Sequence, residues 1–142
     1  MFIKREKPRV VLDTNILISS VIGKLGYSAK ILEKVFLEEI ESITSEEILT
    51  ELQDVFNLKE ILERTNPEDT AFILKEFKNH SEIVSLTIKI KAVHADPSDD
   101  KFIETALAGK AGFIISGDHH LLDLKKFNQI QILQPKAFLE ML

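Results

Sequence analysis

The stretch VVLDTNILIS (residues 10–19) places a single carboxylate, Asp13, in the most apolar part of the chain. The run RVVLD is continuous, β-branched and bounded by polar residues, which predicts a short buried strand. Residues 14–22 are apolar on nearly every side and predict a buried helix. A carboxylate between two buried elements loses its hydration, so we expect Asp13 to have a structural or a chemical task.

Strands and helices alternate through the rest of the chain. We expect further strands at 41–45, within 82–93, at 113–116 and, at an edge of the sheet, at 130–133. We expect helices at 28–40, at 46–56 with a capping box of Thr44 and Glu47, after Pro67, from the N-cap Asp96 to Gly109 or Gly112, and at 135–142. Residues 118–127 predict a short helix or turn. This alternation predicts an α/β fold with a mostly parallel sheet and helices on both faces.

Length and composition indicate one globular domain spanning residues 1–142, with a core at about 9–133 and a terminal helix at 135–142. Apolar residues make up 44% of the chain and charged residues 29%, which argues against disorder. Cysteine is absent, which excludes disulfides and thiolate metal ligands. The chain has no apolar run of membrane-spanning length and no signal-peptide pattern, so we expect a cytoplasmic protein without a membrane partner.

The net charge of −5 disfavours general binding to polyanions, which usually rests on a basic surface. An acidic protein can still act on nucleic acid where metal ions bridge its carboxylates to the phosphates. The basic residues of most interest are Lys24 and Lys101, because both are expected near the loops that carry the acids.

Two carboxylates follow predicted strands that are far apart in the sequence. Asp13 comes directly after VVL, and Asp118 comes after FIIS and Gly117. Ligand sites of open parallel sheets lie at the carboxyl ends of the strands. We therefore expect these two acids at one edge of the sheet.

Two predicted helices add further acids on their core-facing sides. Glu51 lies on the margin of the apolar stripe of its helix, and Asp99 and Asp100 precede the apolar residues of theirs. Carboxylates that converge in a half-buried place repel one another unless a cation neutralises them. An all-oxygen ligand set suits Mg²⁺ or Mn²⁺, which points to metal-dependent phosphoryl transfer.

A purely structural role is the alternative for each acid taken alone. Asp13 could cap the helix that follows it, and Asp96 and Asp99 could also be caps. Two acids at strand ends together with two on helix margins favour function over coincidence. Placement in the sequence leaves the choice between Asp99 and Asp100 open.

Four segments together resemble the PIN domain family, in particular the VapC-like toxins of prokaryotic toxin–antitoxin pairs. They are VVLDTNILIS, SEEILTEL, DPSDDKFIETALAGKAGFIISGD and HHLLDL, and the resemblance runs from about residue 9 to residue 133. It implies a three-layer α/β/α sandwich and an endoribonuclease that hydrolyses RNA with Mg²⁺ or Mn²⁺. It also implies a homodimer and an antitoxin protein that blocks the active site.

The resemblance assigns the catalytic and metal-binding roles to Asp13, Glu51, Asp100 and Asp118, and so selects Asp100 over Asp99. It leaves Asp96 and Asp99 as weaker or supporting ligands. It also implies that Asn15 and Ser116 orient carboxylates or water. The chain departs from many relatives at His119 and His120, which could assist a metal or a phosphate or be exposed turn residues.

Two other functions were weighed against the ribonuclease. A phosphatase of the haloacid-dehalogenase kind needs a second aspartate two positions after the first, where this chain has Asn15. A receiver-like or catalytically degenerate PIN-like module would bind a partner protein. Receiver domains usually have an acidic pair near the first strand, whereas VVLDTN has one acid, and degeneration usually removes acids that this chain retains.

Overall fold

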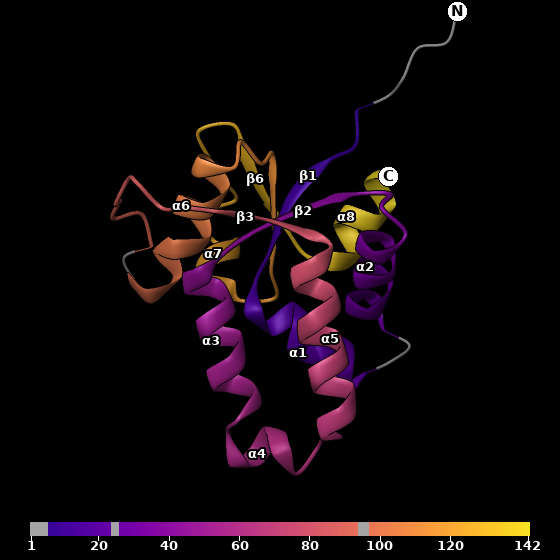
Figure 1. Cartoon of the computed structure of the whole chain (residues 1–142). Coiled ribbons are helices and arrows are strands. Elements are labelled where there is room, and N and C mark those ends of the chain that lie inside the picture. Colours follow the sequence, from indigo (N-terminus) through magenta and orange to yellow (C-terminus); the bar gives the residue numbers. More distant parts are fainter. Residues whose placement is uncertain (1–5, 24–25, 94–96) are drawn as a thin grey trace, which may run out of the picture.

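A computed structural model describes residues 6–23, 26–93 and 97–142, and its centre is a six-stranded sheet (Figure 1). The strand order is β3-β2-β1-β4-β6-β5, and all pairs are parallel except β5 with β6. The strands are β1 (Arg9–Leu12), β2 (Glu41–Ser45), β3 (Ser81–Val84), β4 (Phe113–Ile115), β5 (Lys126–Phe127) and β6 (Ile130–Leu133).

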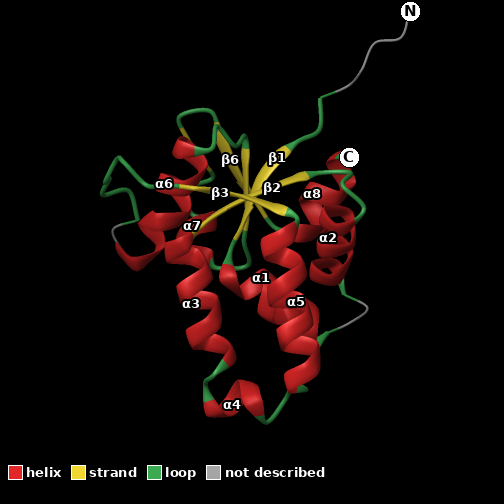
Figure 2. Ribbon diagram, in the orientation of Figure 1, coloured by secondary structure: helices red, strands yellow, loops and turns green. Residues whose placement is uncertain are grey.

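Helices cover both faces of the sheet, as expected for a three-layer α/β/α sandwich (Figure 2). They are α1 (Thr14–Ile22), α2 (Tyr27–Phe36), α3 (Glu46–Phe56), α4 (Lys59–Leu62), α5 (Pro67–Asn79), α6 (Asp100–Ala108), α7 (His119–Leu122) and α8 (Pro135–Met141), with a 3₁₀ turn at Pro97–Asp99. In Figure 1 α3 and α5 extend away from the sheet and α4 joins their far ends. Among the described residues no helix is long and apolar enough to cross a membrane.

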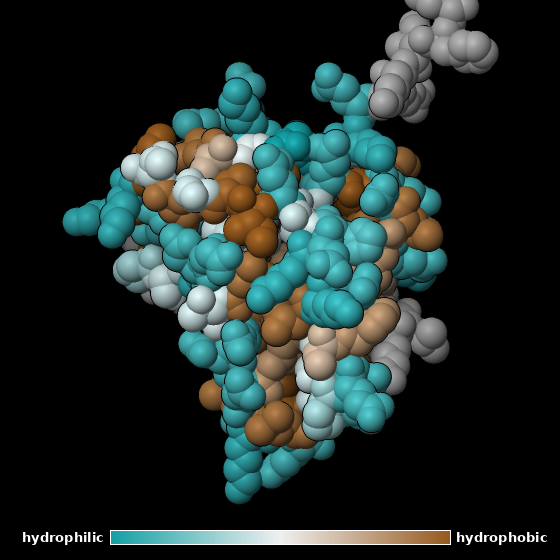
Figure 3. Space-filling model, viewed as in Figure 1, coloured by the Kyte–Doolittle hydropathy of each residue, from teal (hydrophilic) through white to brown (hydrophobic). Residues whose placement is uncertain are grey.

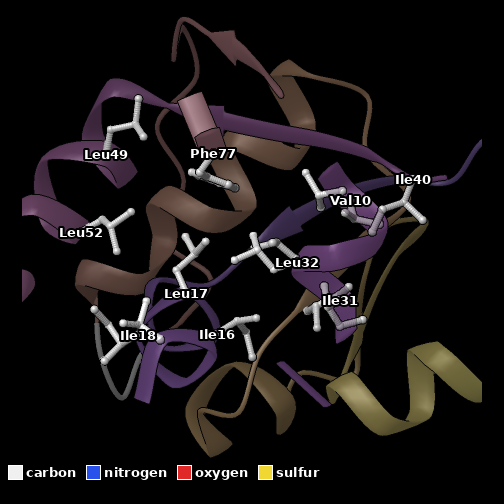
Figure 4. Packing of buried hydrophobic residues seen from close by; sticks show 14 of the residues in the cluster. Val10, Ile16, Leu17, Ile18, Ile31, Leu32, Ile40, Leu49, Leu52 and Phe77 are labelled. Atoms are coloured by element: carbon white, nitrogen blue, oxygen red, sulfur yellow. The ribbon is translucent and has the colours of Figure 1, made fainter. Parts of the chain in front are cut away.

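The core is divided by the sheet into two apolar clusters. Successive side chains of a strand point to opposite faces, so Val10 and Leu12 lie in one cluster and Val11 in the other. The first cluster joins β1 to α1, α2, α3, α5 and α8, and Figure 4 shows Leu17, Leu32 and other buried side chains of this layer converging. The second joins the sheet to α6 and α7. Each fully buried aliphatic side chain contributes about 1.5–3 kcal/mol to folding.

The order of the strands brings the ends of β1 and β4 together. From β1 the chain adds β2 and β3 on one side, and then returns to place β4 on the other side of β1. Leu12 is paired with Ile115, and the Asp13 amide continues the ladder by donating to the Ile115 carbonyl at 3.0 Å. This change of direction is the switch point at which ligands bind in open α/β sheets.

Of the two strand-like runs within residues 82–93 one enters the sheet, as expected: the first contributes to β3, which ends at Val84, whereas the alternating segment TIKIKAV (residues 87–93) is not a strand. Two carboxylates of α6 bind its backbone instead: Glu104 Oε2 accepts from the Ile90 amide at 3.0 Å. Asp100 Oδ1 accepts from the amides of Ala92 at 3.0 Å and Val93 at 2.7 Å. The backbone donors that would pair with a neighbouring strand are thus used by side chains.

Three smaller predictions were wrong. Ser45, and not Thr44, caps α3, because β2 continues through Thr44 and the Ser45 hydroxyl accepts from the Ile48 amide. The second predicted helix ends at Phe36, before Ile40. The strand β6 is not at an edge, because β5 pairs along its outer side. The predicted cap Asp96 lies outside the described residues.

The C-terminal end of α6 packs so closely on β2 that it requires glycine. A Cβ atom built on Gly109 would lie 2.3 Å from Ile43 Cγ2, and Ile43 is completely buried. We expect Gly109→Ala to lower the free energy of unfolding by about 1–3 kcal/mol, because the overlap must be relieved in a packed core. Urea denaturation measures this, with Gly112→Ala as the control because nothing lies within 4 Å of its added Cβ. Equal losses in the two variants would contradict this packing.

The surface in Figure 3 is mostly hydrophilic but has an apolar strip in the lower part of the molecule, between α3 and α5 and beside α4. Large apolar side chains exposed in this region are Leu58, Leu62 and Phe72. The strip lies on the helical projection, away from the strands, so it is separate from the switch point at the ends of β1 and β4.

Candidate metal centre

Asp13 is a buried carboxylate at the end of β1. Its side chain is only 3% exposed. Its Oδ1 accepts from the Asn15 amide at 3.2 Å, which caps α1, and its Oδ2 accepts from the Ser116 hydroxyl at 2.6 Å. The same residue is therefore a helix cap and a carboxylate fixed at the switch point, which unites the two roles considered from the sequence.

A serine hydroxyl connects Asp13 to the segment that follows β4. Ser116 is completely buried, and its Oγ accepts from the Asp118 amide at 2.9 Å while donating to Asp13. Asp118 in turn caps α7, because its Oδ1 accepts from the His120 amide at 2.9 Å. This chain of contacts fixes the relative positions of the two acids that follow β1 and β4.

Burial raises the pKa of the Asp13 carboxyl above its usual range. The hydrogen bonds from the Ser116 hydroxyl and the Asn15 amide partly offset this, since they stabilise the ionised form. The negative charges of Glu51 and Asp118 raise the pKa further. Three of the acids predicted from the sequence are thus close enough to interact electrostatically.

The raised pKa of Asp13 predicts how stability depends on pH in the metal-free protein. The folded chain binds this proton more tightly than the unfolded chain, whose aspartate pKa is about 3.9. The contribution of Asp13 to the free energy of unfolding is therefore greatest below about pH 4 and falls as the pH rises through the raised folded pKa.

Urea denaturation in chelator over this pH range tests the prediction through the difference between the wild type and Asp13→Asn, in which the group does not titrate. We expect wild-type stability to fall relative to the variant as the pH rises. Parallel pH profiles would show that burial does not perturb Asp13.

Glu51 reaches the site from α3 and forms an ion pair with Lys101 of α6, with 2.5 Å between Oε2 and Nζ. Lys101 Nζ also donates to the Ser98 carbonyl at 2.6 Å. The buried Glu51 Oε2 atom is the one that faces the ammonium, so Lys101 compensates its charge. Lys101, one of the two lysines predicted near the site, is therefore part of it, whereas Lys24 lies outside the described residues.

The structure gathers Asp99, and not Asp100, beside Asp118. Among the described residues one ligand atom each of Asp99, Asp118 and His120 lie within 4.8 Å of one another. Asp100 directs Oδ1 to the amides of Ala92 and Val93 instead. The preference for Asp100 over Asp99 that the resemblance gave is therefore not supported by the geometry, and the physical reason is that Asp100 holds the segment after β3.

The other residues predicted from the sequence differ in whether they contact the acids. The Asn15 side chain is exposed, and the contact of this residue with Asp13 is made by its backbone amide. Ser116 contacts Asp13 directly, and Asp96 lies outside the described residues. His120 joins the acids, and the one sequence signal for it is its position two residues after Asp118 at the start of a short helix.

The donors present fit a hard divalent cation. Carboxylate oxygens predominate, and Asp13 is ionised only at a cost in free energy because it is buried and lies in the field of two further acids. A divalent ion would relieve the repulsion between these charges. The fold and the site together define an α/β/α protein with a cluster of acidic side chains at the switch point of its sheet.

Comparison with known proteins identifies the family. Residues 9–120 match the family model described as PIN domain, so the chain belongs to the PIN domain family. Members of this family are typically nucleases and generally use divalent metals. The chain is also 33% identical over 143 residues to an uncharacterized protein, MJ1680, of Methanocaldococcus jannaschii. The aligned region covers 94% of this chain and 91% of that protein.

A solved structure shares the fold. It is the crystal structure of VapBC2 from Rickettsia felis bound to a DNA fragment from their promoter. The TM-score is 0.58, the sequence identity is 17%, and the match covers 87% of this chain and 96% of the other. This similarity confirms the three-layer α/β/α architecture with a mostly parallel sheet.

Proposed function

We propose that this protein is an endoribonuclease that hydrolyses RNA phosphodiester bonds with Mg²⁺ or Mn²⁺, and that it is the toxin of a toxin–antitoxin pair. One observation carries the catalytic part of the proposal. The buried Asp13 carboxylate lies in the field of Glu51 and Asp118, and Asp118 lies beside Asp99. Membership of a family of nucleases supports the reaction class.

In this proposal Asp13, Glu51, Asp99 and Asp118 hold the metal. Ser116 positions Asp13 and the Asp118 turn together, because one hydroxyl contacts both. A bound Mg²⁺ or Mn²⁺ would polarise the phosphodiester and lower the pKa of a water molecule for attack. The chain has a net charge of −5, so it would not attract RNA by itself. A bound metal ion would supply the positive charge that RNA binding needs.

An open hollow of about 480 Å³ adjoins the metal centre and suits the RNA strand. Asn15, two residues after Asp13, and Gly117, directly before Asp118, line the hollow, and Lys136 of α8 contributes a positive charge. Tyr27 of α2 lines the same hollow and offers a ring for base stacking.

The toxin role and the partners follow from the resemblance of the sequence to VapC-like toxins and are supported by the fold shared with VapBC2, which was solved bound to a DNA fragment from their promoter. We accordingly propose an antitoxin protein and a second copy of this chain as partners. An RNA substrate places the proposed activity in the cytoplasm.

Cleavage of RNA by the purified protein tests the proposal. We expect a labelled single-stranded RNA to be cut in MnCl₂ or MgCl₂, to survive in excess EDTA, and to be cut again when Mn²⁺ is added beyond the chelator. Equal cleavage with and without EDTA would exclude the metal-dependent mechanism. Metal binding measured by calorimetry without cleavage of any RNA would instead indicate the degenerate binding module.

A further inference from the structure

We propose that His120 is a nitrogen ligand of the metal centre, together with Asp99 and Asp118, and that its imidazole gives the site a preference for Mn²⁺ over Mg²⁺. This inference rests on the metal centre of the proposed function. It adds a ligand of a different chemical kind to a carboxylate set, and with it a selectivity that carboxylates alone would not provide.

The geometry of His120 fits that of a ligand beside Asp118. One ring nitrogen of His120 lies within 4.8 Å of carboxylate oxygens of both Asp99 and Asp118. The Nδ1 atom is 3.8 Å from Asp118 Oδ1, which is too long for a hydrogen bond between the two. Two ligands of one ion at about 2.1 Å each lie about 3 Å apart when adjacent and about 4.2 Å apart when opposite. The distance of 3.8 Å between His120 Nδ1 and Asp118 Oδ1 lies within that range.

The backbone around His120 holds the imidazole at the site. Its amide donates to Asp118 Oδ1 at 2.9 Å, so the ligand pair is also joined through the cap of α7. The next residue, Leu121, is completely buried in the cluster between the sheet and α6, which anchors the short helix. The His120 side chain itself is 35% exposed, so solvent and a metal ion can reach it.

The neighbouring His119 provides a matched comparison. Its ring packs against that of His120, with 4.2 Å between centroids, but it is exposed and contributes no atom to the group of ligand atoms found among the described residues. The two histidines thus share composition and location but differ in access to the carboxylates. A role that depended only on local positive charge or on helix stability would involve both.

Ligand chemistry connects the imidazole to metal preference. Mg²⁺ takes oxygen ligands and retains much of its water, whereas Mn²⁺ binds nitrogen and oxygen ligands and has higher affinity for imidazole sites. Removal of an imidazole therefore weakens Mn²⁺ binding more than Mg²⁺ binding. The ratio of the two dissociation constants reports the ligand separately from the folding of the site.

Pulsed electron paramagnetic resonance of the Mn²⁺-loaded full chain tests the assignment directly. We expect nitrogen-14 coupling to Mn²⁺ in the wild type, replacement by nitrogen-15 coupling after labelling with nitrogen-15 histidine, loss of the coupling in His120→Ala, and retention in His119→Ala. By calorimetry, His120→Ala should raise the Kd for Mn²⁺ at least about 10-fold and change that for Mg²⁺ less than about threefold.

The outcomes separate this inference from the proposed function. Mn²⁺ that binds the wild type without nitrogen coupling, or coupling that persists in His120→Ala, would overturn the role of His120 and leave the carboxylate centre intact. A wild type that binds no Mn²⁺ would overturn both. The labelling experiment identifies histidine as the ligand without a variant, and if His120→Ala fails to fold, loss of the coupling in His119→Ala would overturn the assignment to His120.

Discussion

The Asp13→Asn variant is expected to lose RNA cleavage by at least about 100-fold, because mutation of groups that only support metal ligands already costs 10- to 100-fold. The proposed centre has Asp13 as its most buried acid, and the Ser116 hydroxyl fixes its orientation. We also expect Mn²⁺ to raise the Tm of the wild type by mass action and to leave that of Asp13→Asn unchanged. Cleavage assays and thermal denaturation with and without Mn²⁺ measure the two effects.

The stability of metal-free Asp13→Asn shows whether its loss of cleavage comes from loss of folding. Substitution by asparagine removes a buried charge whose pKa is raised by burial, so the metal-free variant should be at least as stable as the wild type near neutral pH. The matched control is Asp123→Asn, which neutralises an exposed carboxylate close by in the sequence and should retain activity. Full activity in Asp13→Asn would refute the assignment.

The adjacent acids Asp99 and Asp100 should respond to alanine in opposite ways. Asp99→Ala removes a ligand beside Asp118, so we expect at least about a 10-fold weaker affinity for Mn²⁺. Asp100→Ala removes the acceptor of two backbone amides, at Ala92 and Val93. It should lower the free energy of unfolding by about 2–4 kcal/mol.

Calorimetric Mn²⁺ titration and urea denaturation of both variants provide this comparison. A stability loss of this size corresponds to a fall in Tm of about 5–15 °C for a chain of this length. The Mn²⁺ affinity of folded Asp100→Ala should stay close to that of the wild type. If Asp100→Ala lost Mn²⁺ binding and Asp99→Ala retained it, the choice that the resemblance made would be right and the geometric argument wrong.

The sequence was sufficient to place the acids that follow strands. The continuous apolar runs before Asp13 and Asp118 defined β1 and β4, and parallel strands bring their carboxyl ends to one edge. The margin position of Glu51 on α3 likewise predicted a side chain directed toward the sheet, and its charge acts on Asp13. These inferences required only periodicity and the rule for parallel sheets.

The choice between Asp99 and Asp100 required information that periodicity does not contain. Residues 97–99 form a 3₁₀ turn before α6 begins at Asp100. A 3₁₀ turn rotates the chain by about 120° per residue and an α-helix by about 100°, so the direction of each side chain depends on where one gives way to the other. In addition, residues 87–93 alternate between apolar and polar side chains, which suggested a strand and gave no sign that carboxylates of α6 bind their amides.

The central claim is that acids from four separate segments hold one metal centre. A crystal structure of the protein grown with MnCl₂, with data collected at an energy where manganese scatters anomalously, tests this claim most directly. We expect an anomalous peak within ligand distance of oxygens of Asp13, Asp99 and Asp118, with Glu51 directed toward it. Full Mn²⁺ loading with the peak elsewhere, or with no peak among these carboxylates, would contradict it.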